Sequence, residues 1–351
     1  MMSFPFGKHT GGRGDLHMTN QSNDSEAQRF HHQVLLAKDL CMSYGPRQAL
    51  RGLSFSLQAG RVLGFLGPNG AGKTTAIRIL TTILEPSSGH FTVDGISSEY
   101  PERIRHKIGV LPESMGFPKQ VTGIEYLTYF GRLYGRTATE ARIRSGALLE
   151  KVGLQQRAKS LIGTYSRGMR QRLGIARALV NDPAVVFLDE PTLGLDPRGQ
   201  QELLGLVWRI SREEDAGLVL CSHLLLEIER YCDDVIILSS GRVVAAGSVS
   251  EVIGRAQRNA IRIHVPSPSV AEAQQVVEAV PNVMKVSLAG GMAGWLRVEM
   301  AEPAQGTSKN GHVNNRILEA LIRAGIPILD FGAEGSRLQD AFLHLTEEAI
   351  K

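Results

Sequence analysis

A glycine-rich run of eight residues carries the strongest chemical signal in the sequence. Gly67-Pro68-Asn69-Gly70-Ala71-Gly72-Lys73-Thr74 matches the pattern G-x-x-x-x-G-K-[ST] in full. Glycine permits tight turns that aim backbone N–H groups at phosphate oxygens, and a helix that begins at Lys73 would point its positive end at the same place. We therefore predict a nucleotide-phosphate site. Lys73 would reach the β- and γ-phosphates, the hydroxyl of Thr74 would bind Mg²⁺, and Thr75 belongs to the same binding segment.

Two adjacent acids end an apolar run further along the chain. Val185-Val186-Phe187-Leu188 predicts a buried parallel strand, and Asp189 and Glu190 follow at its carboxyl end, where such sheets bind ligands. We expect Asp189 to hold Mg²⁺ through water and Glu190 to orient or activate the water that attacks the γ-phosphorus. An acid pair after a strand is by itself usually a solvated turn. The phosphate loop in the same chain favours the catalytic interpretation.

Strands alternate with helices around these residues, which indicates a parallel sheet covered by helices. Strands are predicted at 35–43, 50–57, 61–66, 184–188, 218–221, 235–238 and 242–245, and helices from 73, over 122–154, over 168–180 and from 198. The glycine-rich run thus stands between a strand and a helix, which disfavours the alternative of a chance turn.

The chain divides into an arm and two domains. Residues 1–33 are rich in Gly, Ser, Asn and His and predict a flexible arm, 34–258 form the nucleotide-binding domain, and 259–351 form a small accessory α+β domain. The accessory pattern is strand 261–265, helix 271–280, strands 283–288 and 294–300, helix 314–325, strand 327–331 and helix 337–349. That order predicts a split βαβ, ferredoxin-like domain with one added helix.

Composition excludes several classes of protein. Hydrophobic residues make up 42% and charged residues 21% of the 351 residues, and Lys+Arg 39 against Asp+Glu 35 leaves a net charge of +4. This charge is too weak to indicate a nucleic-acid partner. No window approaches 18 apolar residues, and the amino-terminal residues have no apolar secretory core. The three cysteines fit neither a disulfide framework nor a paired metal site, so a reducing cytosol is expected.

A third motif indicates the kind of phosphate-loop protein. Tyr165-Ser166-Arg167-Gly168-Met169 lies before Asp189, and Ser166 precedes that acid by 23 positions. Ser166 is predicted to be a helix N-cap that leaves backbone amides free to bind an anion. Here the sequence resembles the ATP-binding subunits of ABC transporters, whose signature reads L-S-G-G-Q, over about residues 34–255. Tyr, Arg and Met replace three signature residues, while Ser166 and Gly168 remain.

The resemblance implies roles for four further residues. Asp196 matches the family's D-loop, His223 matches the switch histidine that contacts the γ-phosphate, and Tyr44 matches the aromatic residue that stacks on adenine. Glu113 stands where most members have Gln; it can bind Mg²⁺ but cannot donate a hydrogen bond when ionised. The alternatives are a structural histidine, an aromatic residue at a strand end and a turn aspartate.

The family resemblance also implies an architecture and an assembly. The fold would be an α/β P-loop NTPase domain of the ABC type with a helical subdomain at about 114–180. One chain carries one set of motifs, so each ATP would lie between the loop Gly67–Thr74 of one copy and Ser166–Met169 of a second, in a two-fold homodimer. The segment Glu113–Leu154, with its tyrosines, would contact a permease, unless those aromatic residues are internal core.

The expected function is ATP hydrolysis that energises an ABC transporter. Variants such as Y-S-x-G-M-R-Q-R and the closing segment Arg337–Thr346 resemble the drug, antibiotic and lipid exporter branch, although the closing helix could instead pack only on its own domain. The chain would be peripheral on the cytoplasmic face of the cell membrane, with a separate permease subunit. The alternatives are a soluble ABC-type ATPase acting on ribosomes or DNA, and a regulatory module in which residues 259–351 sense a ligand. A single motif set without a heptad run disfavours the first of these.

Overall fold

A six-stranded sheet forms the centre of the molecule. The computed structural model describes residues 32–256, 260–288, 293–301, 311–333 and 337–348. The strand order is β10-β9-β3-β8-β7-β6, and neighbours from β9 to β6 run parallel. The strands are β3 (Val62–Leu66), β6 (Ile108–Leu111), β7 (Val185–Asp189), β8 (Gly217–Cys221), β9 (Asp234–Ser239) and β10 (Arg242–Ser248). The central strands are almost wholly apolar because both of their faces are buried.

An antiparallel sheet lies beside the central one. It consists of β1 (Gln33–Tyr44), β2 (Arg47–Gln58), β4 (Ser88–Val93) and β5 (Ile96–Ser97) in the order β2-β1-β4-β5. The predicted strands 35–43 and 50–57 form its β1–β2 hairpin. Helix α2 (Lys73–Leu80) and Phe65 of β3 share one hydrophobic core with this sheet. The strands β4 and β5 and the short helix α3 (Pro101–Arg105) were not predicted from the sequence.

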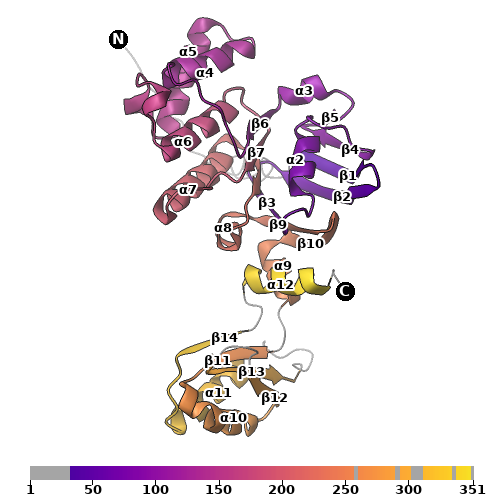
Figure 1. Ribbon diagram of the computed structural model, residues 1–351, viewed down its shortest axis with the longest axis vertical. Helices are drawn as coiled ribbons and strands as arrows, with labels where there is room; N and C mark the ends of the chain where they lie inside the picture. The colour runs from indigo at the N-terminus through magenta and orange to yellow at the C-terminus, as the bar shows by residue number, and fades with distance from the viewer. Residues whose placement is uncertain (1–31, 257–259, 289–292, 302–310, 334–336, 349–351) are drawn as a thin grey trace, which may run out of the picture.

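Three helices form a subdomain at one end of the central sheet (Figure 1). They are α4 (Gly123–Leu133), α5 (Ala138–Lys151) and α6 (Arg167–Ala178). The predicted helical stretch 122–154 is interrupted, because Thr137 starts a new helix with a capping box to Glu140, as Thr122 does with Glu125. Helices α7 (Pro197–Glu214), α8 (Leu225–Tyr231) and α9 (Val249–Ala256) follow. Among the described residues no helix is long and apolar enough to span a membrane.

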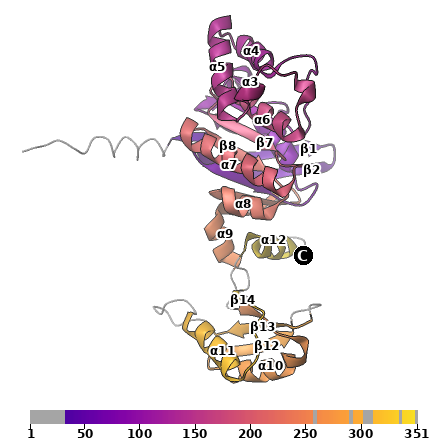
Figure 2. The ribbon, with the colours of Figure 1, turned by 90° about the vertical axis from the view of Figure 1, so that its left-hand side faces the viewer.

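The accessory unit has its own sheet and its own core. Its elements are β11 (Ala260–His264), α10 (Val270–Glu278), β12 (Val283–Leu288), β13 (Trp295–Met300), α11 (Gly311–Arg323) and β14 (Asp330–Ala333). The strand order is β12-β13-β11-β14 with antiparallel pairing throughout, which is the split βαβ arrangement. This unit lies below α9 and α12 in Figures 1 and 2.

The closing helix α12 (Leu338–Glu348) packs mainly on α8 and α9. It also meets the accessory sheet through an ion pair, since Asp340 lies 3.9 Å from Arg262 of β11. Leu338 and Ala341 are fully buried in the core that also holds Ile228 of α8, and the Leu338 N–H donates to the carboxylate of Glu229 at 3.0 Å. The sequence grouped this helix with a domain over 259–351; the structure differs because its apolar face completes the core of the preceding part. The predicted boundary near 258 and the arm, apart from its last two residues, lie outside the described residues.

We predict that Leu338→Ala releases α12 from α8 and α9. Truncating a fully buried leucine removes about 2–5 kcal/mol of packing free energy, and Leu338 is 0% exposed. Amide hydrogen exchange measured by mass spectrometry should become faster across α12 and the facing side of α8. Leu343→Ala is the matched control, because Leu343 lies on the same helix and is 51% exposed. Unchanged exchange in Leu338→Ala would contradict this packing.

Candidate functional site

Four neighbouring strands end at one edge of the central sheet, and their following loops carry the chemistry. The glycine-rich loop follows β3, His223 follows β8, Glu190 follows β7, and Glu113 follows β6. A cavity of about 580 Å³ lies at this edge. Its walls comprise Tyr44, Arg47, Ala49, Asn69, Gly70, Ala71, Gly72, Lys73, Thr74, Thr75, Arg78, Glu113, Asp189, Glu190, Leu193 and His223. The sheet topology therefore brings most of the predicted site residues together.

The phosphate loop depends on glycine at two close backbone approaches. Gly67 and Gly72 have φ angles of 155° and 108°. A Cβ on Gly67 would lie 2.4 Å from the carbonyl oxygen of Leu238, and one on Gly72 would lie 2.7 Å from that of Ala49. The Lys73 ammonium donates to the carbonyl oxygens of Gly67 at 2.5 Å and Pro68 at 3.2 Å. Gly67 and Pro68 do not line the cavity, and they contribute to the site through these carbonyls.

Glu190 and His223 form a close pair at the cavity wall. Their Oε2 and Nδ1 atoms are 2.8 Å apart, and the side chains are 17% and 56% exposed. Glu190 has a φ of 48°, a conformation that L-residues adopt at a cost of about 1–3 kcal/mol. Its N–H donates to the carbonyl oxygen of Cys221 at 3.0 Å, which continues the β7–β8 pairing by one residue. This bond holds the backbone of Glu190 against the end of β8.

Negative charge accumulates at the strand ends. Burial raises the pKa of Asp189, and the charges of Glu190 and Glu113 raise it further, while Lys73 and Arg78 act in the opposite direction. Together with the hydroxyl of Thr74 these carboxylates are oxygen ligands that Mg²⁺ accepts. Among the described residues no group of three or more His, Cys, Asp and Glu side chains could hold a metal ion by itself. The donor set therefore fits a cation that shares its coordination with nucleotide phosphates.

Comparison with known proteins identifies the family. The family model described as ABC transporter matches residues 50–193. The daunorubicin resistance ATP-binding protein DrrA3 of Streptomyces coeruleorubidus is 35% identical over 86% of this chain and 92% of its own length. The chain belongs to the ATP-binding subunits of ABC transporters. It is an ATPase that binds ATP, as the phosphate loop and acid pair predicted.

Two further similarities cover the same ABC-type ATPase domain. The linearmycin resistance ATP-binding protein LnrL of Bacillus subtilis is 35% identical over 63% of this chain and 71% of its own length. The structure of cbiO1 from Clostridium perfringens, described as part of the ABC transporter complex cbiONQ, aligns with a TM-score of 0.58 and 29% identity over 64% of this chain and 92% of that one. The predicted α/β P-loop NTPase fold is confirmed.

The residues that resemble the family's signature and D-loop lie outside the phosphate-loop cavity. Ser166 caps α6 and accepts from the N–H of Met169 at 3.2 Å, as predicted for an N-cap. Asp196 caps α7 and accepts from the N–H of Gly199 at 3.3 Å. Neither of these residues, nor Gly168, lines the cavity. Within one copy these residues therefore form no part of the phosphate-loop cavity.

The departures from the family signature have local explanations. Tyr165 is buried, its hydroxyl donates to the carbonyl oxygen of Arg157 at 2.7 Å, and burial raises its pKa. It thus fills the core where the family signature has leucine. The guanidinium of Arg167 packs against Gly194, where a Cβ would lie 2.4 Å from the Arg167 Cζ. Arg167 therefore connects the start of α6 to the segment that leads to Asp196.

Four cavity residues were not predicted from the sequence: Arg47, Ala49, Arg78 and Leu193. Arg78 lies four residues after Thr74 on α2, so helical periodicity could have placed both on one face. Arg47 begins β2 directly after the turn that follows Tyr44, and a hairpin prediction could have found it. Ala49 and Leu193 carry no chemical signal in the sequence.

We predict that Gly72→Ala lowers the affinity for ATP about 5- to 150-fold, because strain of about 1–3 kcal/mol must be relieved by moving the loop. The added Cβ would meet the carbonyl oxygen of Ala49 at 2.7 Å and a Leu50 methyl group at 2.8 Å. Titration with a fluorescent ATP analogue measures the change. Gly205→Ala is the control, because a Cβ on Gly205 meets nothing within 4 Å. Equal affinities in the two variants would contradict the steric argument.

We also predict that Asp189→Asn stabilises the nucleotide-free protein at neutral pH. The folded-state pKa of Asp189 is raised, so ionising this carboxyl costs stability above that pKa, and asparagine removes the cost. The gain in melting temperature should be largest at about pH 7.5 and should shrink as the pH is lowered through the folded pKa of Asp189. Thermal unfolding without Mg²⁺ measures it. A variant that is less stable than the parent at pH 7.5 would refute the electrostatic account.

Proposed function

We propose that the chain hydrolyses ATP at an interface between two copies and thereby energises export through a separate membrane permease. One observation carries the proposal. Lys73, Glu190 and His223 line a single cavity, whereas Ser166 and Gly168 do not line it. A signature that binds ATP must therefore come from a second chain, and a two-fold homodimer supplies two such sites.

Each cavity residue then has a distinct task. The loop amides and the Lys73 ammonium bind the β- and γ-phosphates, and Tyr44, which is 45% exposed at the cavity rim, stacks on adenine. The Glu190 carboxylate accepts a proton from the attacking water and orients that water. His223 lies 2.8 Å from Glu190 through Nδ1. To donate from Nε2 to the γ-phosphate at the same time, the imidazole must carry both protons.

The metal of the reaction would be held by Thr74, Asp189 and Glu113, which line the cavity together. Mg²⁺ supplies charge neutralisation on the phosphate oxygens when bound. Asp189 carries a raised pKa because of burial and two neighbouring carboxylates, and a divalent cation would favour its ionised form. Glu113 takes the position of the family glutamine as an oxygen ligand and accepts hydrogen bonds without donating any.

The partner copy would contribute the start of α6. The Ser166 hydroxyl and the first amides of that helix would contact the γ-phosphate, and Asp196 would lie at the same interface. ATP then joins the two copies, and hydrolysis removes the contacts that depend on the γ-phosphate. Binding and release of the second copy follow from this difference between the two states.

Export through a permease is favoured by the relatives and by one exposed surface. DrrA3 and LnrL are named for resistance to daunorubicin and linearmycin, and cbiO1 is described as part of a transporter complex. On α4, Tyr129 and Leu133 are 60% and 61% exposed beside a hollow of about 530 Å³. This surface is the proposed permease contact, which would hold the chain at the cytoplasmic face of the membrane. Tyr126, in contrast, is buried, so it belongs to the core and not to a groove.

We predict that two substitutions separate binding from hydrolysis. Lys73→Ala should abolish ATP binding, because the ammonium that reaches the phosphates is removed. Glu190→Gln should still bind ATP, lower the hydrolysis rate about 10²- to 10⁴-fold, and accumulate as an ATP-bound dimer in sedimentation. Glu202→Gln on the exposed side of α7 is the control and should retain parental activity. Parental hydrolysis by Glu190→Gln would remove Glu190 from the proposed role.

A further inference from the structure

A buried polar cluster lies beneath the Glu190–His223 pair. The carboxylate of Glu227 on α8 accepts, through Oε2, from the hydroxyl of Ser222 at 2.8 Å and from that of Thr192 at 3.2 Å. The Ser222 oxygen in turn accepts from the N–H of Leu224 at 3.0 Å. Ser222 and Thr192 are almost completely buried, and Glu227 is 9% exposed. One carboxylate oxygen thus joins two hydroxyls that belong to different loops.

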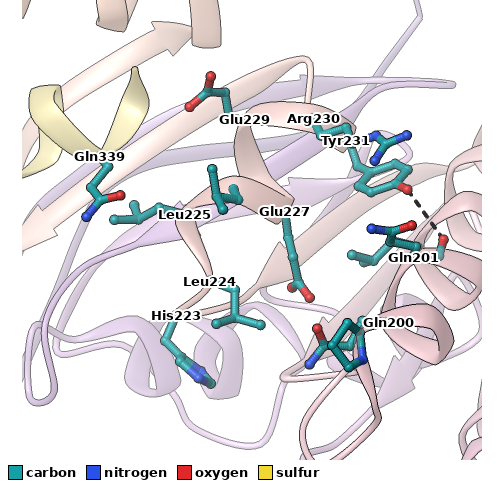
Figure 3. Close-up of a pocket in the computed structure, with 13 residues that line it drawn as sticks. Gln200, Gln201, His223, Leu224, Leu225, Glu227, Glu229, Arg230, Tyr231 and Gln339 are labelled. Carbon is teal, nitrogen blue, oxygen red and sulfur yellow. Dashed lines mark hydrogen bonds between the residues drawn. The ribbon is translucent and has the colours of Figure 1, made fainter. Parts of the chain in front are cut away.

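Burial at this position disfavours the charged form of the Glu227 carboxylate. Its side chain extends from α8 past Leu224 on the wall of a cavity of about 740 Å³ (Figure 3). Burial raises the pKa of Glu227, while the hydrogen bonds from Ser222 and Thr192 lower it. The second oxygen, Oε1, is buried and has no hydrogen-bond partner within the described part of the chain. An apolar side chain would avoid the free-energy cost of desolvating a carboxylate. What Glu227 provides in its place is the pair of hydrogen bonds that Oε2 accepts.

The two hydroxyls are placed next to the reacting pair in the sequence. Ser222 directly precedes His223 in the loop after β8, and Thr192 follows Glu190 by two residues in the loop after β7. Each loop also has backbone bonds of its own, such as Leu193 N–H to the Glu190 carbonyl oxygen at 3.2 Å. Glu227 ties one loop to the other through side chains. Glu227 thus restrains the two loops that carry Glu190 and His223.

We propose that Glu227 is a positioning residue for ATP hydrolysis, whose carboxylate fixes the loops of Ser222 and Thr192 so that Glu190 and His223 meet at the γ-phosphate. This inference rests on the proposed roles of Glu190 and His223. Glu227 itself does not line the phosphate-loop cavity, so it acts through the two loops. A displacement of about 1 Å at the reacting groups lowers a rate about 100-fold while leaving binding of the rest of the nucleotide intact.

The test is a comparison of kcat and KM for ATP. Glu227→Ala should lower kcat about 10- to 100-fold with KM within about two-fold of the parent. Glu227→Gln should restore kcat to within about three-fold, because its amide oxygen can accept from both hydroxyls. Glu229→Ala is the matched control on the same helix. Its carboxylate accepts from Leu338 N–H and touches neither loop, so parental kcat is expected.

A double-mutant comparison separates this role from a general loss of stability. The pair Ser222→Ala and Thr192→Val removes both donors, and it should lower kcat as much as Glu227→Ala does. Adding Glu227→Ala to that pair should lower kcat no further, because the three residues act through the same two hydrogen bonds. If Glu227→Ala fails to fold, the kcat of the Ser222 and Thr192 pair and that of Glu227→Gln still test the role of Glu227.

Two kinds of result would overturn the inference. The first is parental kcat in Glu227→Ala, or in the Ser222 and Thr192 pair, with ATP binding intact. The second is a loss of kcat in Glu227→Ala that Glu227→Gln shares in full, or that adds fully to the loss of the pair. If Glu190→Gln has lost hydrolysis in the same assay, such results reject only the role of Glu227. If Glu190→Gln hydrolyses ATP at the parental rate, the proposed function of the pair fails first.

Discussion

Parallel pairing of four adjacent strands is the constraint on which the site depends. Strands β3, β8, β7 and β6 are hydrogen-bonded in this order, so their following loops leave the sheet at one edge. Adjacent strands lie about 4.8 Å apart, which brings side chains that follow neighbouring strands within hydrogen-bond reach. Glu190 and His223 follow β7 and β8 and meet at 2.8 Å. A shift of one residue in the β7–β8 register would turn Glu190 away from His223.

The same edge concentrates opposite charges within one cavity. Glu113, Asp189 and Glu190 lie near Lys73 and Arg78. Burial and the charges of Glu190 and Glu113 raise the pKa of Asp189, while the cations favour bound phosphate. Nucleotide phosphates with Mg²⁺ would satisfy both sets. The strained φ of Glu190 and the tight glycine positions of the loop are local costs that the surrounding sheet tolerates.

Much of this could be predicted from the sequence because short-range rules determine it. The loop Gly67–Thr74 and the acid pair were found from residue type and spacing, and the structure places them at one cavity. The interruption of the predicted helix 122–154 was missed although both capping boxes can be read locally. Helix α12 was predicted as a helix, but its partner core could not be, because an apolar face does not specify which surface it covers.

Glu227 illustrates the limit of prediction from sequence. It lies four residues after His223, on the short helix α8, and belongs to no motif. Its proposed role can be inferred only from the fold, which brings Thr192 and Ser222 within hydrogen-bond distance of its carboxylate. Ser166 and Asp196 show the converse case. Their motifs were found in the sequence, yet within one chain they line no part of the phosphate-loop cavity. A complete site therefore requires a second copy in this account.

Complementation between two inactive variants tests that composite site most directly. Lys73→Ala disables the phosphate loop, and Gly168→Asp places a negative charge where the signature would face the γ-phosphate. An added Cβ at Gly168 meets only Leu195, at 3.8 Å, so the fold should tolerate it. Random pairing leaves one intact site in each mixed dimer, so an equimolar mixture should regain about one quarter of the parental ATPase rate. A mixture that forms mixed dimers and stays as inactive as its components would contradict the account.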